Sequence, residues 1–154
     1  MMMECKPCGI CSWNFELRGE GHHVSSRIDW IGENGRLIID GELHPVVRKG
    51  LFSGKWTLES AAGYRLQAKK TSILRRKIEI LGPSGKASLF PESALVGRSM
   101  KIKGGGVNCT IYRVHPFTRR SIIEGEWSDF RVVAFGFWLT AIIWSRDTNR
   151  SGTR

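Results

Sequence analysis

Apolar and polar residues alternate through most of this chain, with the period of two that is typical of β-strands with one buried face. The alternation begins at Trp13-Asn14-Phe15-Glu16-Leu17 and returns after short segments rich in Gly, Asn, Asp and Ser. Such segments predict turns, and we expect hairpins at residues 32–35 (through Asn34-Gly35) and 40–41. The expected strands cover residues 13–17, 24–31, 36–39, 55–60, 64–69, 76–81, 86–90, 99–103, 107–114 and 121–124. About ten short strands with such turns predict an antiparallel sandwich or barrel.

The period changes after Trp127, where Asp129 is a candidate N-cap for a helix. Residues 130–144 contain a single charge, Arg131, so a helix here must be buried on every side. Residues 132–144 would span about 20 Å, whereas the hydrocarbon core of a membrane is ~30 Å thick. We therefore expect a core helix over about 129–146, enclosed by the strands. A tail-anchored protein with 130–144 in the membrane is the alternative.

The 154 residues fit one domain, which we place at residues 13–146. Residues 1–12 contain three consecutive Met and a compressed Cys run, and we expect a flexible or spurious tail. Residues 147–154 are expected to form a polar tail. No apolar region near the N-terminus is similar to a signal peptide, so the expected location is the cytoplasm, at the periphery of a membrane. Single-pass insertion through 130–144 is again the alternative.

A closed antiparallel β-barrel of about ten to twelve short strands around a C-terminal apolar helix resembles the tubby C-terminal domain group. That group includes the LURP-one-related proteins and the phospholipid scramblases. The resemblance covers residues 13–146 and depends on the hairpin series and on the helix sequence DFRVVAFGFWL at 129–139. It implies a barrel around a central helix and a lipid-facing or scaffold role. Tubby domains are larger, and neither their phosphoinositide-binding residues nor the scramblase calcium-binding segment has a counterpart here, so the resemblance supplies no site.

The charge is one-sided, with 24 Lys and Arg against 14 Asp and Glu and a net charge of +10. Such a chain is attracted to polyanions, although solvated strand faces would also explain the excess. We expect association with an anionic phospholipid membrane. Nucleic acid is less favoured, because single-strand readers need exposed aromatic residues and most aromatics here lie on the inward phase of strands or in the helix. The predicted anion-binding residues are Arg75, Arg76, Lys77, Lys101, Lys103, Arg119 and Arg120.

The remaining candidates for chemistry are sparse. Cys5, Cys8 and Cys11 have a spacing that suits zinc or an iron–sulfur cluster, but three thiolates fall short of four ligands, so we expect no metal and no cofactor. His22 and His23 precede a strand and are more typical of a surface turn than of a proton-transfer site. No nucleophile elbow, phosphate-binding loop, zinc-protease motif or dinucleotide fingerprint is present, so we expect a binding module that is not an enzyme.

Overall fold

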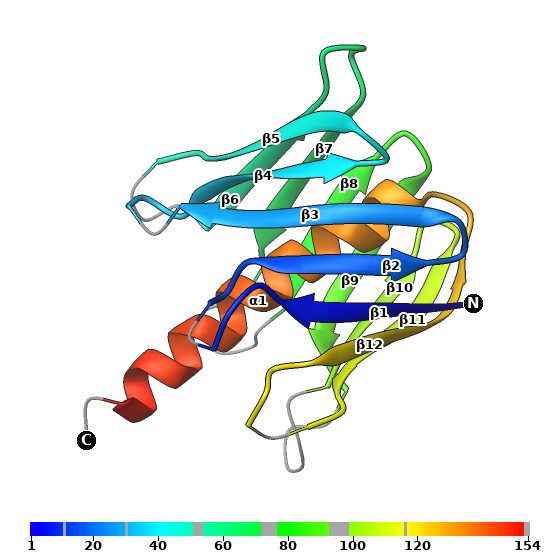
Figure 1. Ribbon diagram of the computed structural model, residues 1–154. Helices are drawn as coiled ribbons and strands as arrows, with labels where there is room; N and C mark the ends of the chain where they lie inside the picture. The colour runs from blue at the N-terminus through cyan, green and yellow to red at the C-terminus, as the bar shows by residue number, and fades with distance from the viewer. Residues whose placement is uncertain are drawn as a thin grey trace.

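The computed structural model describes residues 1–10, 12–29, 31–50, 54–71, 77–92, 99–115 and 117–152, with the side chains of 149–152 excepted. These residues form twelve β-strands and one α-helix, and the strands make one closed barrel (Figure 1). The predicted mainly-β barrel with a C-terminal helix is thereby confirmed. The strands are β1 Met2–Pro7, β2 Phe15–Gly19, β3 His22–Asp29, β4 Asn34–Ile39, β5 Glu42–Arg48, β6 Lys55–Glu59, β7 Arg65–Lys70, β8 Ile78–Gly82, β9 Gly85–Pro91, β10 Met100–Gly104, β11 Val107–Arg113 and β12 Ser121–Trp127.

The barrel is a meander in which every strand pairs antiparallel with its neighbours in the chain. Within the strands, buried and more exposed residues mostly alternate, as in β2, where Phe15 and Leu17 are buried and Glu16 and Arg18 are not. Because successive side chains point to opposite faces of a strand, one face of each strand lines the interior and the other meets solvent. The hydrophobic core is therefore the inside of the barrel.

The N-terminal segment closes the barrel, which corrects the prediction that residues 1–12 form a tail. Strand β1 pairs with β2 on one side and with β12 on the other, for example through Cys5 opposite Leu17 and Met3 opposite Ile123. The Met3 side chain has no exposed surface, and Cys5 is 1% exposed. A barrel has no edge strands only if its first and last strands meet, and β1 supplies that closure.

The helix α1, Phe130–Gly152, runs through the barrel (Figure 1). Asp129 caps it as predicted, because its Oδ1 accepts a hydrogen bond from the backbone N–H of Arg131 at 3.1 Å. The helix packs against β3 and β4 on one wall and against β8, β10 and β11 on the opposite wall. Consecutive helix residues such as Phe137, Trp138 and Leu139 are completely buried, so the strands surround it. The prediction of an enclosed core helix is confirmed.

The end of the helix differs from the prediction. α1 continues to Gly152, so residues 147–152 are helical and do not form the separate polar tail that was expected. These turns project beyond the strands in Figure 1. Among the described residues, no helix has both the length and the apolar character that a membrane crossing requires.

The hairpin between β3 and β4 also differs from the prediction. The turn occupies residues 31–33, and Asn34 and Gly35 already belong to β4, opposite Asp29 and Ile28. Asn34 uses its side chain to accept a hydrogen bond from the backbone N–H of Arg48 on β5 at 2.7 Å. Gly35 lies under the indole of Trp138, where a Cβ would be 2.8 Å from Nε1. Asn34 and Gly35 therefore do not form the turn. Asn34 binds the neighbouring strand β5, and Gly35 leaves room for the Trp138 side chain of the helix.

The two ends of the barrel differ in their connections. The helix-start end carries the turns 20–21, 40–41, 60–64, 83–84 and 105–106, together with residues 128–129 before α1. The helix-exit end carries the connections from β1 to β2, β3 to β4, β5 to β6, β7 to β8, β9 to β10 and β11 to β12. The two candidate sites lie at these opposite ends.

Candidate functional site

Five lysines gather at the helix-exit end, where β5, β6, β7 and β8 begin or finish. Backbone hydrogen bonds bring these strand ends together: Lys49 N–H donates to Lys55 O at 2.8 Å, Lys70 N–H to Gly54 O at 2.8 Å, and Thr71 N–H to Lys77 O at 3.1 Å. Neighbouring strands lie about 4.8 Å apart, so four strands place the lysines along a rim of about 15 Å. We refer to Lys49, Lys55, Lys69, Lys70 and Lys77 as the lysine cluster.

Two members of the lysine cluster face each other directly. Lys55 of β6 is paired with Lys69 of β7, and both side chains are exposed. Glu79 of β8 lies opposite Lys69 on the other side, but its nearest ion-pair partner is Lys86, at 3.6 Å. In the part of the chain that the structure describes, no carboxylate comes within 4 Å of the Lys55 or Lys69 ammonium. Like charges directly opposite in a sheet are destabilising.

The predicted anion-binding residues do not all meet at this rim. Lys77 belongs to the lysine cluster, whereas Arg75 and Arg76 lie outside the described residues. Lys101 and Lys103 point outward from β10, which β9 separates from β8, and Lys103 lies toward the helix-start end. The predicted residues are therefore spread over two or more faces of the barrel.

Arg119 has structural contacts that its sequence context did not suggest. Its Nη1 donates hydrogen bonds to the backbone oxygens of Ile10 at 3.3 Å and Ser12 at 3.2 Å, and its guanidinium lies 4.1 Å from the Trp13 ring centroid. Its backbone is in the left-handed region, with φ of 59°. Arg119 thus fastens the β11–β12 connection to the segment before β2, while its neighbour Arg120 is exposed.

Other arginines close the helix-exit end of the barrel. Glu33 pairs with Arg48 at 2.8 Å and with Arg146 of α1, and both guanidinium groups lie within 6.0 Å of the Trp56 ring centroid. On another side of α1, the Arg113 guanidinium lies 4.7 Å from the Trp144 ring. These contacts tie the exit of the helix to the β3–β4 turn, to β5 and to β11.

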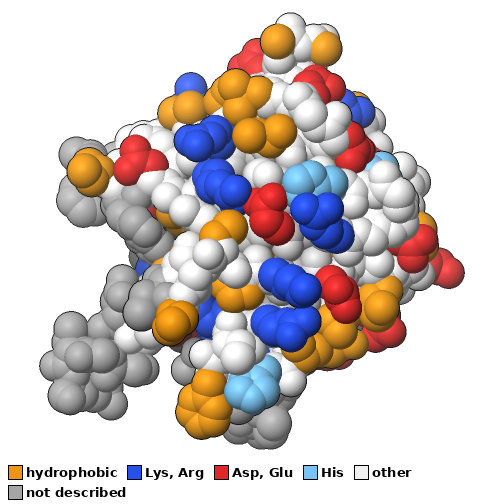
Figure 2. Space-filling model, viewed as in Figure 1, with side chains coloured by type: hydrophobic (Ala, Val, Ile, Leu, Met, Phe, Trp, Pro, Cys, Tyr) orange, Lys and Arg blue, Asp and Glu red, His pale blue; other side chains and the backbone are white. Residues whose placement is uncertain are grey.

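Strands β1 to β4 present a mixed face, on which blue Lys and Arg side chains surround acidic ones (Figure 2). On β2, Glu16 accepts hydrogen bonds from Ser25 Oγ at 3.0 Å and from His23 Nε2 at 2.9 Å, and it pairs with Arg27 at 2.8 Å. Partial burial alone would raise the pKa of the Glu16 carboxyl. The hydrogen bonds from Ser25, His23 and Arg27 outweigh burial and lower that pKa below its ordinary value.

We expect Glu16→Gln to lower the free energy of unfolding by about 1 kcal/mol at neutral pH. A carboxyl whose folded-state pKa is lowered stabilises the fold above its unfolded-state pKa, and that contribution disappears as the pH falls through the lower folded value. The difference between Glu16→Gln and the parent should therefore become smaller as the pH falls into the acid range. Urea unfolding at about pH 7 and about pH 3 measures it. Glu4→Gln is the control, because the Glu4 side chain makes no hydrogen bond within the described residues; a pH-independent difference would contradict the assignment.

The cysteines do not form a common site. Cys5 points into the barrel and is 1% exposed, whereas Cys8 is exposed and lies 3.4 Å from Nη1 of Arg27. Burial, together with the charge of Glu4, raises the pKa of the Cys5 thiol well above its ordinary value, which disfavours the thiolate that metals bind. Cys11 lies outside the described residues. Within the described ranges, no three His, Cys, Asp or Glu side chains are close enough to hold a metal ion.

A cleft of about 570 Å³ opens at the helix-start end. His22 lies against Phe130 with ring centroids 4.3 Å apart and an interplanar angle of 10°, and its Nδ1 is 2.6 Å from Oδ2 of Asp40. The backbone N–H of His23 donates to Oδ1 of Asp40 at 2.9 Å, and this bond is the main reason that the pKa of Asp40 is lowered. The prediction of a surface turn is wrong for this pair, because His22 and His23 are the first two residues of β3, where both contact Asp40 of the neighbouring turn. The cleft is lined by Met1, Glu20, His22, Ile39, Asp40, Glu42, His44, Trp127, Ser128, Asp129, Phe130 and Arg131.

Tyr64 and Arg131 fix one wall of this cleft to the start of the helix. The Tyr64 hydroxyl donates a hydrogen bond to Oδ2 of Asp129, and the Arg131 guanidinium lies 3.5 Å from the Tyr64 ring centroid. Burial first, and then the bond to Asp129, raise the pKa of Tyr64. The hydroxyl therefore keeps its proton, and this group positions the N-cap.

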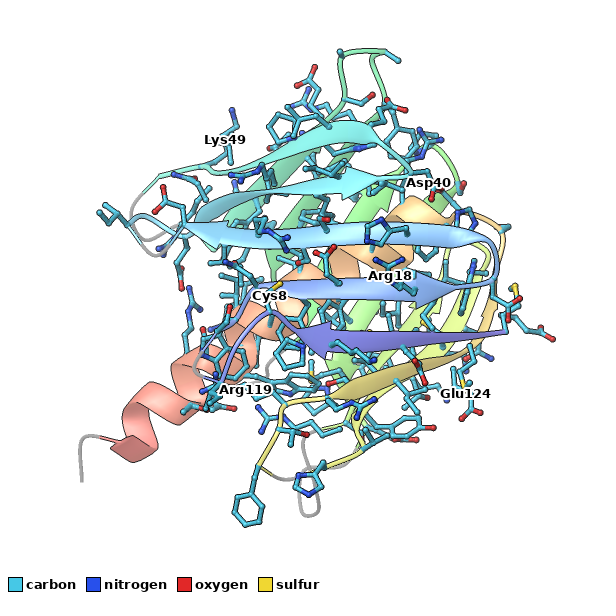
Figure 3. The ribbon with its side chains drawn as sticks, viewed as in Figure 1. Cys8, Arg18, Asp40, Lys49, Arg119 and Glu124 are labelled. Atoms are coloured by element: carbon cyan, nitrogen blue, oxygen red, sulfur yellow. The ribbon has the colours of Figure 1, made fainter. Side chains whose placement is uncertain are left out.

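The structure thus separates two charged regions: Lys49 and Arg119 lie at one end of the viewed face, and Asp40 lies at the other (Figure 3). Lys55 was not among the predicted anion-binding residues, although counting back from the turn at 60–64 places it opposite Lys69. The cleft could not be foreseen, because it joins residues from both ends of the chain. No family model, curated protein or solved structure matches this chain.

Proposed function

We propose that this protein is a non-enzymatic binding module of tubby-like architecture that docks its helix-exit end on an anionic phospholipid membrane. The observation that carries the proposal is the lysine cluster with its repulsive Lys55–Lys69 pair. Each Lys near an anionic leaflet contributes about 1 kcal/mol, so five give roughly 5 kcal/mol of salt-sensitive attraction. The cytoplasmic leaflet carries such lipids, which makes a peripheral cytoplasmic location the natural one.

Exposed apolar side chains at the same end favour a lipid surface over nucleic acid. Ile10, Ile31 and Phe117 are 94%, 87% and 86% exposed, and they are the most exposed large hydrophobic residues described. All three lie in connections at the helix-exit end. Ile10 and Ile31 are aliphatic, and aliphatic side chains suit insertion at the boundary of headgroups and acyl chains but cannot stack with bases. The ring of Phe117 is compatible with either partner. The last turns of α1 project from this end and would lie among the headgroups.

The architecture supports the tubby-like assignment. Twelve antiparallel strands around a C-terminal helix are the arrangement that the sequence resemblance implies. The fold holds the five lysines in fixed positions, because each of them lies on a strand of the closed sheet or directly beside one. Membrane attraction through preformed lysines avoids much of the entropy cost of ordering a flexible basic tail.

The test is sedimentation with phosphatidylcholine vesicles with and without phosphatidylserine, at about 0.1 M and about 0.5 M salt. The parent should bind the anionic vesicles alone, and more weakly at high salt. Lys55→Ser/Lys69→Ser removes about 2 kcal/mol of attraction and should weaken binding about thirtyfold. The variant should unfold no more easily than the parent, because it loses a repulsive pair.

The matched control is Lys86→Ser/Lys103→Ser, which removes two lysines toward the helix-start end and should leave vesicle binding unchanged. Phe117→Ser should weaken the binding that survives at high salt. Equal binding to neutral vesicles, no binding to either kind, or the same loss in the control variant would refute the proposal. Salt-dependent binding to an oligonucleotide without binding to vesicles would favour the nucleic-acid alternative.

A further inference from the structure

The cleft at the helix-start end contains a buried imidazole with an unused acceptor. His44 points inward from β5 and is 1% exposed. Its Nδ1 lies 3.0 Å from the backbone oxygen of Glu42. A carbonyl oxygen only accepts, so Nδ1 carries the hydrogen, and Nε2 of the neutral ring is left as an acceptor. Among the described residues, Nε2 has no hydrogen-bond partner.

His44 belongs to the cleft lining, and its Nε2 lies near a carboxylate of the same lining. Nε2 lies 3.9 Å from Oε1 of Glu42, whose half-exposed side chain is also part of the cleft lining. That separation is too long for a hydrogen bond but close enough that one small donor group could contact both atoms. A buried polar atom without a partner destabilises a fold, so its presence in a cleft suggests that a ligand supplies the missing donor.

The charged residues that line the cleft indicate the charge of the ligand. Four carboxylates line the cleft, those of Glu20, Asp40, Glu42 and Asp129. Glu20 accepts a hydrogen bond from the backbone N–H of Met2, and Asp40 and Asp129 have the partners described above, so Glu42 is the lining carboxylate that has no hydrogen bond among the described residues. The cations at the cleft are already engaged: Arg131 with Asp129 and the Tyr64 ring, and the Met1 ammonium with the backbone oxygen of Gly125. Asp129 caps the helix and offsets the positive end of its dipole.

An aromatic wall completes the cleft. Phe130 lies between His22, with which it stacks, and Trp127, whose ring centroid is 6.1 Å away. Aromatic faces attract both flat apolar groups and cations. A volume of about 570 Å³ is in the range of small-molecule sites.

We propose that this cleft binds a small organic cation with N–H donors, an arylalkyl ammonium compound. The ammonium donates to Nε2 of His44 and to the carboxylate of Glu42, and the aryl group lies along Phe130 and Trp127. This site is separate from the lysine cluster at the other end of the barrel, so it does not depend on the proposed membrane docking.

Benzylammonium is the probe, and benzyl alcohol is its neutral counterpart of nearly equal shape. Binding is followed by changes in tryptophan fluorescence and in the nuclear magnetic resonance signals of the histidine rings. The alcohol should bind about tenfold more weakly than the cation, because it lacks the charge-assisted hydrogen bonds. Glu42→Gln should weaken benzylammonium binding about tenfold for the same reason. Glu59→Gln, which removes an exposed carboxylate at the same end but outside the cleft lining, should have no effect.

His44→Leu separates a ligand role from a structural one. If His44 serves a ligand, the variant should bind benzylammonium about fivefold more weakly, yet unfold at an equal or higher denaturant concentration because the unpartnered nitrogen is gone. Absence of benzylammonium binding, equal binding of benzyl alcohol, or unchanged binding by both Glu42→Gln and His44→Leu would each overturn the proposal.

Discussion

A chain that ends at Ser128 is expected not to fold. The barrel interior is filled by α1, so removing the helix leaves the inward faces of the strands around an empty space. Burying one large apolar side chain contributes about 1.5–3 kcal/mol, and the helix supplies many of them to a fold whose total stability is of the order of 5–15 kcal/mol. The largest fully buried residues of the helix are Phe135, Phe137, Trp138 and Trp144. Circular dichroism and amide chemical-shift dispersion should both show an unfolded chain.

A chain that ends at Thr148 is the matched control, because it keeps all the helix residues whose side chains the structure shows to be buried. This chain should retain the circular dichroism spectrum and the unfolding midpoint of the parent. A folded, soluble barrel in the chain that ends at Ser128 would contradict the role of α1 as the core. It would favour the alternative in which residues 130–144 are an appendage to an independent β domain.

The substitution Gly35→Ala is expected to lower the free energy of unfolding by about 3–5 kcal/mol. The added Cβ would clash with the backbone oxygen of Arg27 and would lie 2.8 Å from Nε1 of Trp138. That nitrogen donates a hydrogen bond of 2.9 Å to the same Arg27 oxygen. The oxygen cannot move freely because Ile28 and Gly35 are paired in the β3–β4 ladder, so the indole must shift and lose its partner. Urea unfolding measures the loss, and altered tryptophan fluorescence of the folded variant would report the shift.

Gly9→Ala is the control for this prediction. A Cβ at Gly9 would have Ser12 Cβ as its nearest neighbour, at 3.8 Å, which is an ordinary van der Waals contact. Its backbone does not require the left-handed region, and the residue is exposed. The change should be within about 0.5 kcal/mol of the parent. A loss of less than about 1 kcal/mol in Gly35→Ala would show that the helix and β4 adjust more freely than the close approach indicates.

Most of the architecture could be predicted because most strands have a local sequence pattern that identifies them. Alternation in segments such as β2 and β7 fixes which side chains face inward, and the all-round apolar character of residues 130–144 requires an enclosure. Asn34-Gly35 shows the limit of such local rules. The pair has the sequence of a tight turn, but the space under Trp138 needs a residue without a side chain, and packing with a helix a hundred residues away decided the position of the turn.

Long-range pairing explains what the sequence did not reveal. Only Met3 and Cys5 of β1 are buried, and this short alternation has no meaning until β12 is known to lie beside it. The candidate site residues also depend on contacts between segments that are far apart in the sequence. Lys77 could be selected from a run of basic residues, but Arg119 is held by Trp13 and the backbone of Ser12, which only the closed barrel brings near. His44 looked unremarkable because nothing nearby in the sequence shows that its Nε2 is unpartnered.

The pairing of β1 with β12 has a consequence for how the molecule is made. Ribosomes deliver β1 before α1, yet Met2 must find Glu124, and strands as early as β3 and β4 must pack on α1. Entropy opposes closing a loop of that length before other contacts exist, so folding should be slow and should follow the completion of synthesis. Until then the nascent chain exposes unpaired strands whose apolar faces have no helix to cover, which makes it a client for chaperones that bind extended apolar segments.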